Sequence, residues 1–206
     1  MNKRDADHAR VLSAGLTEGV QGFTPLPYVA TELQTLDGLY RSRLLLNQAF
    51  LTSNLENEMK EHPYSIVHIA THGKFEKRVE DTFLLTFDDK LTMNELAHAV
   101  GFFRFREEPL ELLTLSACET AAGDDRAALG LAGVAIKAGA SSALATLWFI
   151  SDQASSMLVS EFYRQLHDRP VSKAVALQQA QLKMLGDPVY DHPAYWAPFL
   201  LLNNWL

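Results

Sequence analysis

The sequence contains one cysteine, Cys118, so no disulfide can form within the chain. A single cysteine gives no sign of an oxidising compartment. No apolar run approaches the ~20 residues that a membrane-spanning helix needs. Residues 1–12 (MNKRDADHARVL) lack the apolar stretch of a secretory signal peptide. We therefore expect a cytoplasmic protein that does not enter a membrane.

Positive charge is also scarce, because 18 Lys and Arg residues stand against 25 Asp and Glu residues, for a net charge of −7. A nucleic-acid-binding surface needs a basic stripe that releases counterions, and a protein held at a membrane surface needs a polybasic segment. The composition therefore argues against direct binding to nucleic acid or to a membrane surface. With 48% hydrophobic residues in 206, the chain can bury the core of one globular domain.

Several motifs of catalysis and cofactor binding are missing. The chain has no G-x-S-x-G turn, no Walker loop, no H-E-x-x-H pair and no C-x-x-C pair. The aspartates of two acidic pairs, 88–89 and 124–125, could bind a cation, but solvated turns explain them better. We expect no metal site and no cofactor.

Strand-like and helix-like segments alternate along the chain, which is typical of an α/β fold. Expected strands cover residues 10–14, 42–46, 65–71, 111–116, 142–147 and 196–202. Expected helices cover residues 28–40, 52–62, 92–102, 127–138, 151–167 and 170–185, and residues 82–91 read as a hairpin with an acidic turn. Because the strands are apolar on both faces, we expect a mostly parallel sheet with helices on both sides.

Two apolar strands end in residues that can carry chemistry. Residues 65–71 lead into His72 and Gly73, and residues 111–116 lead to Cys118. If these strands are parallel neighbours, both side chains emerge at the same edge of the sheet, where ligands of open α/β sheets bind. An imidazole can take the proton of a thiol and make it a nucleophile, and the amides of Gly73 and Cys118 could face a developing oxyanion.

Plainer interpretations stand beside this one. A lone cysteine is often a small buried hydrophobe, and a histidine at a strand end is often structural. His68, four residues before His72 and inside the strand, is expected to be a core histidine or one that supports the site. The position of His72 and Cys118 at strand ends, with glycine after the histidine, favours the catalytic interpretation.

Four blocks of sequence resemble the CHAT domain, a bacterial relative of the caspases and separases. They are VHIATHGKF, LLTLSACETAAGD, LGLAGVAIKAGASSALATLW and HPAYWAPFLLLNNW, in the order that the family has them. The resemblance covers residues 10–206 and leaves residues 1–9 as a tail. It implies the caspase-like three-layer αβα sandwich, with a mostly parallel central sheet and a small β-hairpin excursion.

The resemblance also implies an activity, that of a clan CD cysteine endopeptidase with a Cys-His dyad. The histidine of the family's A-T-H-G motif matches His72, and the cysteine of its S-A-C-E-T motif matches Cys118. Cys118 would be the nucleophile and His72 the proton acceptor and donor, with the amides of Gly73 and Cys118 as the oxyanion hole. The substrate would be a protein or a peptide.

The run LWFISD resembles the L-W-x-V-x-D run of separases, whose aspartate lines the pocket for a basic side chain at P1, the residue before the scissile bond. The matching residue is Asp152, which implies a substrate-binding role and a weak preference for arginine or lysine. The alternative is that Asp152, next to Ser151, caps the helix that follows.

CHAT domains usually lie at the C-terminal end of longer chains, behind TPR repeats or other sensor modules. We therefore expect regulation by an attached or partner sensor module, and this chain reads as a bare domain or the end of a longer polypeptide. Two other functions stay open: a non-catalytic interaction module, and a small-molecule hydrolase or transferase that uses the same thiol. The intact His72 and Cys118 favour the peptidase.

Overall fold

A six-stranded sheet forms the centre of the computed structural model, which describes residues 9–74, 81–116, 133–147 and 150–206. Its strand order is β2-β1-β3-β7-β8-β9, and all neighbours are parallel except β8 and β9. The strands are β1 (Val11–Gly15), β2 (Arg43–Leu46), β3 (Ile66–Ala70), β7 (Leu112–Ser116), β8 (Ser142–Thr146) and β9 (Phe199–Asn203). The mostly parallel sheet expected from the apolar strands is confirmed.

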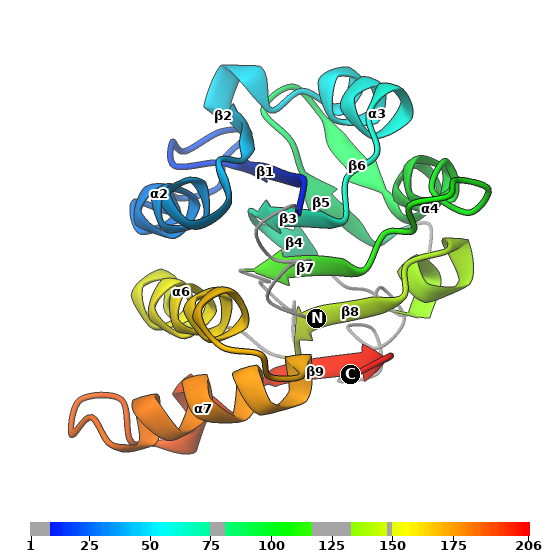
Figure 1. Ribbon diagram of the computed structural model, residues 1–206. Helices are drawn as coiled ribbons and strands as arrows, with labels where there is room; N and C mark the ends of the chain where they lie inside the picture. The colour runs from blue at the N-terminus through cyan, green and yellow to red at the C-terminus, as the bar shows by residue number, and fades with distance from the viewer. Residues whose placement is uncertain (1–8, 75–80, 117–132, 148–149) are drawn as a thin grey trace.

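Helices cover both faces of this sheet and make three layers (Figure 1). One layer holds α2 (Val29–Tyr40), α6 (Asp152–Asp168) and α7 (Lys173–Leu185). The other holds α3 (Thr52–Glu61), α4 (Met93–Gly101) and helical residues 133–138. Short 3-10 turns lie at η1 (Asn47–Ala49) and η3 (Pro193–Tyr195). Within the described segments, no helix has the length and apolar character that crossing a bilayer requires.

A small antiparallel sheet stands beside the main one. It consists of β4 (Gly73–Lys74), β5 (Phe83–Leu85) and β6 (Lys90–Thr92). The hairpin expected at residues 82–91 is therefore confirmed as β5 and β6, with the side chain of Thr86 donating a hydrogen bond to the carbonyl of Asp89 across its turn. Strand β4 was not expected, since a two-residue strand carries no periodic signal; it exists because the chain after His72 pairs with Leu84.

The core divides between the two faces of the sheet. On α2, the apolar residues at helical spacing (Val29, Leu33, Leu36 and Tyr40) are all buried, as the periodicity predicts. Strands β3 and β7 are buried at every position, which explains why they read as continuous apolar runs.

Side chains cap the starts of α4, α6 and α7. Thr92 and Glu95 form a capping box at the start of α4. Helix α3 differs, because Thr52 is its first residue and the amide of Thr52 donates instead to Asp88 of the β5–β6 turn, at 3.1 Å. Strand β9 begins at Phe199, later than expected, because residues 196–198 form a turn that follows η3, in which the amide of Ala197 donates to the carbonyl of Pro193 at 2.8 Å. Of the expected small-residue helix at 127–138, residues 127–132 lie outside the described part.

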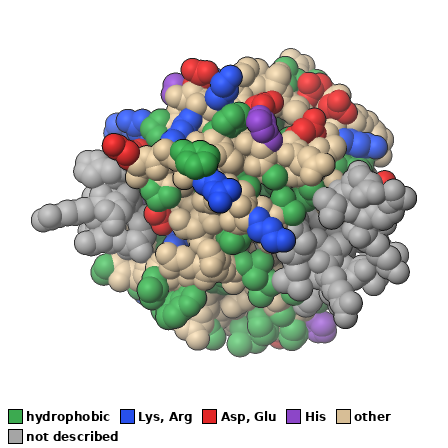
Figure 2. All heavy atoms as spheres, turned by 90° about the vertical axis from the view of Figure 1, so that its right-hand side faces the viewer, with side chains coloured by type: hydrophobic (Ala, Val, Ile, Leu, Met, Phe, Trp, Pro, Cys, Tyr) green, Lys and Arg blue, Asp and Glu red, His purple; other side chains and the backbone are tan. Residues whose placement is uncertain are grey.

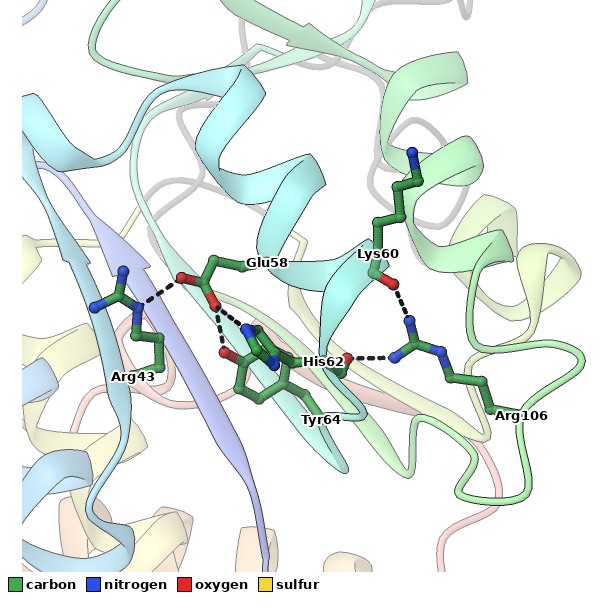
Figure 3. A network of polar contacts seen from close by, with 6 residues as sticks. All are labelled: Arg43, Glu58, Lys60, His62, Tyr64 and Arg106. Carbon is green, nitrogen blue, oxygen red and sulfur yellow. Dashed lines mark hydrogen bonds and ion pairs between the residues drawn. The ribbon is translucent and has the colours of Figure 1, made fainter.

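The C-terminal end of α3 is held by a cluster of polar contacts (Figure 3). Glu58 accepts hydrogen bonds from Arg43 Nε at 2.7 Å and from Tyr64 Oη at 2.6 Å, and His62 lies 3.8 Å away. Burial raises the pKa of Glu58, but the hydrogen bonds from Tyr64 and Arg43 outweigh it, so the pKa lies below its usual range. Arg106 adds hydrogen bonds to carbonyl groups at the end of this helix.

Candidate active site

Strands β3 and β7, which lead to the two candidate catalytic residues, are parallel neighbours in the centre of the sheet. Their register places Ala70 opposite Ser116. His72 follows Ala70 by two residues, and Cys118 follows Ser116 by two. Cys118 lies outside the described residues, so its distance from His72 stays a prediction that the strand pairing supports.

The backbone around His72 is held from two sides. The amide of Thr71 donates to the carbonyl of Ser116 on β7 at 3.2 Å, which continues the main sheet past the end of β3. On the other side, the hydroxyl of Thr71 donates to the carbonyl of Leu85 at 2.7 Å, and the amide of Leu85 donates to the carbonyl of His72 at 2.8 Å. The main sheet and the small sheet together fix the point where the imidazole leaves the backbone.

The imidazole of His72 is oriented by the segment between β1 and α2. Its Nε2 atom lies 2.8 Å from the carbonyl oxygen of Thr24. Because a carbonyl only accepts, Nε2 must carry the proton, which leaves Nδ1 as the proton acceptor of the neutral ring. No described residue hydrogen-bonds Nδ1. The ring of Phe23 packs on the imidazole with centroids 5.1 Å apart, and His72 is only 6% exposed.

Neither Phe23 nor Thr24 was singled out from the sequence. The contact of Thr24 uses a backbone carbonyl, and every residue has one, so no side-chain pattern could point to it. Phe23 lies in a segment without helix or strand periodicity, where an aromatic residue carries no positional meaning. The only hint in the sequence was the length of the connection between β1 and α2, in which both residues lie.

Gly73, the first residue of β4, is buried and pairs with Leu84 of β5. It therefore lies directly after the imidazole and within the small sheet. Its role as an oxyanion donor, together with the amide of Cys118, stays a prediction.

Asp152 is the first residue of α6, and it lies at the meeting point of α6 and α2. The side chain of Ser151 caps α6 by accepting from the amide of Ala154 at 3.2 Å. Asp152 therefore does not provide the N-cap of its own helix. Its Oδ2 atom instead accepts from the amide of Tyr28, the residue before α2, at 2.7 Å. The carboxylate thus joins the first turns of two helices.

The charge of Asp152 is destabilised by its surroundings. Burial has the largest effect and raises the pKa of this carboxyl group, and the charge of Glu32 raises it further. The hydrogen bond from the amide of Tyr28 and the nearby His72 lower the pKa, but by less, so it lies above its usual range. A cation placed beside such a carboxylate stabilises its negative charge. This is the property that a pocket for a basic side chain needs.

A groove of about 320 Å³ begins beside Asp152 and runs between α2, α6 and α7. Its wall near Asp152 is formed by Tyr28 and Gln153, and hydroxyl groups from both helices line it further along. These are the side chains of Thr31, Thr35, Ser156 and Ser160. Neither Asp152 nor His72 lines this groove, although Tyr28 and Gln153 are the residues next to Asp152.

A second, wider groove of about 740 Å³ lies on the opposite helix layer, over α4 and residues 133–138. Phe105 on its wall is 91% exposed, and Arg104 and Lys137 lie in the same wall. Figure 2 shows this face of the molecule, where basic side chains lie next to hydrophobic ones. It belongs to the helix layer that is remote from Asp152.

His68 is fully buried, which confirms the expectation of a core or supporting histidine. Its Nε2 atom lies 2.8 Å from Oε1 of Glu32 on α2. Glu32 was not identified from the sequence, although a signal was present: an acidic residue on the apolar face of the helix at 28–40. Among the described residues, no group of three His, Cys, Asp or Glu side chains gathers as metal ligands.

Comparison with known proteins places this architecture in a family. The model of the CHAT domain matches residues 3–204. A search of curated protein sequences finds no match.

Solved structures share the fold at low sequence identity. The complex of the pro- and mature domains of RgpB from Porphyromonas gingivalis superposes with a TM-score of 0.61 and 10% identity, over 100% of this chain and 49% of that chain. The Arg-specific cysteine proteinase gingipain R superposes with a TM-score of 0.61 and 9% identity, over 100% of this chain and 48% of that chain. Protein GSU0716 from Geobacter sulfurreducens superposes with a TM-score of 0.50 and 11% identity, over 86% of this chain and 90% of that chain.

This chain spans about half the length of the two gingipain chains. At such identities the likeness shows the fold alone, and that fold is the caspase-like sandwich of a mostly parallel sheet between two helix layers. The family model covers nearly the whole sequence, including the strands that lead to His72 and Cys118. The chain belongs to the CHAT domain family.

Proposed function

We propose that this chain is a cysteine endopeptidase that cuts protein substrates with Cys118 as nucleophile and His72 as general acid and base. The observation that carries the proposal is the contact between His72 Nε2 and the carbonyl of Thr24. It assigns the ring proton to Nε2 and makes Nδ1 a proton acceptor, at the edge of the sheet where β7 leads to Cys118.

In this reaction Nδ1 of His72 takes the proton of the Cys118 thiol, and the thiolate attacks the carbonyl carbon of the scissile peptide bond. The amides of Gly73 and Cys118 stabilise the oxyanion that forms. The C–N bond breaks as His72 gives its proton to the leaving amine. Water, deprotonated by the same imidazole, then hydrolyses the thioester and restores the thiol.

Asp152 selects the side chain at P1 in this proposal. Its charge is destabilised by burial, so a guanidinium or ammonium group bound beside it gains more than it would at an exposed carboxylate. One oxygen is used by the amide of Tyr28, and the other has no hydrogen bond from any described residue. The name of gingipain R, an Arg-specific cysteine proteinase of the same fold, supports a basic P1 residue here.

The partners in this proposal are a protein or peptide substrate and a regulatory sensor module, such as a TPR region, in the cytoplasm. A sensor module explains how a peptidase would be restrained until its signal arrives. It also means that the domain by itself can be slow toward peptides, so a test of the dyad needs a readout that does not depend on an activator.

Alkylation of Cys118 by iodoacetamide provides that readout, because the chain has no other thiol. We expect the rate constant between pH 6 and pH 7 to exceed that of free cysteine by at least about tenfold, and His72→Ala to remove the difference. His98→Ala, at an exposed position on α4, is the matched control and should leave the rate unchanged. Fluorogenic peptides with arginine, lysine or leucine at P1 then report cleavage, with Cys118→Ala as the blank. Equal alkylation rates in wild type and His72→Ala, with no cleavage, would overturn the proposal.

A further inference from the structure

A carboxyl group and an imidazole are buried in contact with each other beneath the candidate site. Glu32 on α2 is 1% exposed and His68 on β3 is 0% exposed, and Oε1 of Glu32 lies 2.8 Å from Nε2 of His68. The two atoms are in ion-pair contact but outside hydrogen-bond geometry, and neither hydrogen-bonds any other described residue. The proposed reaction uses neither side chain.

Further polar groups surround this pair in the layer between the sheet and α2 and α6. Tyr163 of α6 has its hydroxyl 3.3 Å from Nδ1 of His68, and donates to the hydroxyl of Thr114 at 2.7 Å. The register aligns Ser13, His68 and Thr114 across β1, β3 and β7. A polar row therefore crosses the middle of three neighbouring strands, β1, β3 and β7.

Such a cluster is a costly way to hold two elements together. Removing polar and ionisable groups from water carries a desolvation penalty, and apolar side chains of similar volume often give equal or greater stability. Apolar contacts, however, tolerate sliding, whereas the short contact between a carboxyl group and an imidazole is kept only in a narrow range of relative positions. The pair therefore suits the task of fixing α2 against β3.

Both elements lead directly to the candidate site. The amide of Glu32 donates to the carbonyl of Tyr28, whose own amide binds Asp152. Along β3, His72 follows His68 by four residues. Between the pair and the site lies a small apolar cluster that joins the start of α2 to the end of β3; its buried members are Leu26, Val29, Leu33 and Ala70. The segment of Thr24, which orients His72, enters α2 through this cluster.

We propose that Glu32 and His68 are a positioning pair, which sets the place of α2 on β3 so that the Thr24 carbonyl meets His72 and the Tyr28 amide meets Asp152. This inference rests on the proposed peptidase function. It gives the pair a role in the geometry of the site that a core contact for stability alone would not have.

The test separates position from stability. Two variants are compared with wild type: Glu32→Gln, which keeps the shape and removes the charge, and the double variant Glu32→Leu with His68→Leu, which replaces the pair by apolar side chains. Leu36→Ala, one turn further along the buried face of α2, is the control that lowers stability without touching the pair. Each protein is measured by thermal unfolding and by the rate of Cys118 alkylation, with His72→Ala as the zero point.

We expect the double variant to melt at or above the wild-type temperature and yet to lose about tenfold or more of the His72-dependent alkylation rate, since a small displacement of reacting groups is enough for such a loss. Glu32→Gln should show a similar loss of rate, whereas Leu36→Ala should melt earlier and keep the rate. If Glu32→Gln does not fold, the double variant decides.

A folded double variant with an alkylation rate within twofold of wild type overturns the positioning role, and so does a loss of rate in Leu36→Ala equal to that in Glu32→Gln. Failure of the proposed function looks different. In that case wild type and His72→Ala react equally fast, before any variant of the pair is considered.

Discussion

The Nε2 atom of His72 lies 2.8 Å from the carbonyl oxygen of Thr24, a residue 48 positions earlier in the chain. This backbone carbonyl therefore fixes the tautomer and the orientation of the ring, as a carboxylate does in a Ser-His-Asp triad. It does so without adding a charge. The direction in which Nδ1 points then depends on how firmly the segment of Phe23 and Thr24 is held.

The first prediction concerns the ring of Phe23, which packs on His72 with centroids 5.1 Å apart and meets Phe83 edge to face. Phe23→Ala removes this support, so we expect the alkylation rate of Cys118 to fall about tenfold through misplacement of the imidazole. Phe87→Ala is the control, because Phe87 is another half-buried residue packed on the same core cluster and makes no ring contact with His72. Equal rates in the two variants would contradict the orienting role of Phe23.

The second prediction concerns the charge of Asp152. Its pKa is raised above the usual value by burial, so the folded state holds the carboxyl proton more tightly than the unfolded chain does. Stability is therefore lost as the pH rises through the unfolded pKa, about 3.9, toward the folded one. Asp152→Asn keeps an oxygen for the amide of Tyr28 and removes the charge. We expect its stability at pH 7 to equal or exceed that of wild type, with no gain below about pH 3.

The same variant tests specificity. If Asp152 selects a basic P1 residue, Asp152→Asn should lower kcat/KM for arginine and lysine peptides by about tenfold or more and leave a leucine peptide unaffected. Denaturant unfolding at several pH values and a comparison of the three peptides provide both measurements. An unchanged preference for arginine would assign Asp152 only the structural role of joining α2 to α6.

The order of strands and helices could be predicted because each element buries a periodic apolar face. Strands β3 and β7 read as apolar runs since both of their faces are covered. That they are parallel neighbours was only a condition of the sequence argument, and their register establishes it. The expected stripe on α2 is buried as predicted. Strand β4 could not be predicted, because two residues show no period and its formation depends on the pairing of Gly73 with Leu84.

The surroundings of the candidate site could not be predicted in the same way. His72 was found from its place at a strand end, but the carbonyl of Thr24 has no side-chain signature. His68 was noted as a histidine inside an apolar strand, whereas Glu32, on the apolar face of its helix, was not identified. Only the topology, which lays α2 across β3, shows that the two exceptions meet.

The third prediction concerns Glu58, whose carboxylate accepts hydrogen bonds from Tyr64 and Arg43. Because the pKa of Glu58 is lowered in the folded state, its contribution to stability is present above the unfolded pKa and is lost as the pH falls through the folded pKa. We expect Glu58→Gln to cost about 1–3 kcal/mol at pH 7 and progressively less below about pH 4.

Glu56→Gln is the control for this prediction, because Glu56 is on the same helix and has only a half-exposed contact with His98 at 3.6 Å. Surface pairs of this kind contribute less than about 1 kcal/mol. Urea unfolding of both variants between pH 3 and pH 7 makes the comparison. A cost for Glu58→Gln that does not change with pH would show that its charge is not what stabilises the end of α3.

The fourth prediction compares two glycines, one in a tightly packed position and one with open space around it. At Gly15, the last residue of β1, a Cβ atom would lie 2.7 Å from the carbonyl oxygen of Ala70 and 2.8 Å from Cγ1 of Val29, so β1, β3 and α2 meet too closely for any side chain. Gly15→Ala should therefore cost about 1–3 kcal/mol. At Gly38, inside α2, a Cβ atom would meet nothing within 4 Å, and Gly38→Ala should gain up to about 1 kcal/mol from helix propensity.

The two substitutions add the same methyl group, so opposite signs in urea unfolding would isolate the effect of close packing. Ala70 lies two residues before His72, so the displacement that Gly15→Ala forces at its carbonyl should also slow the alkylation of Cys118. Gly38→Ala should leave that rate at the wild-type value. A neutral Gly15→Ala would mean that α2 can move away from β3 at no cost, which would also remove the physical basis for a fixed position of the Thr24 carbonyl over His72.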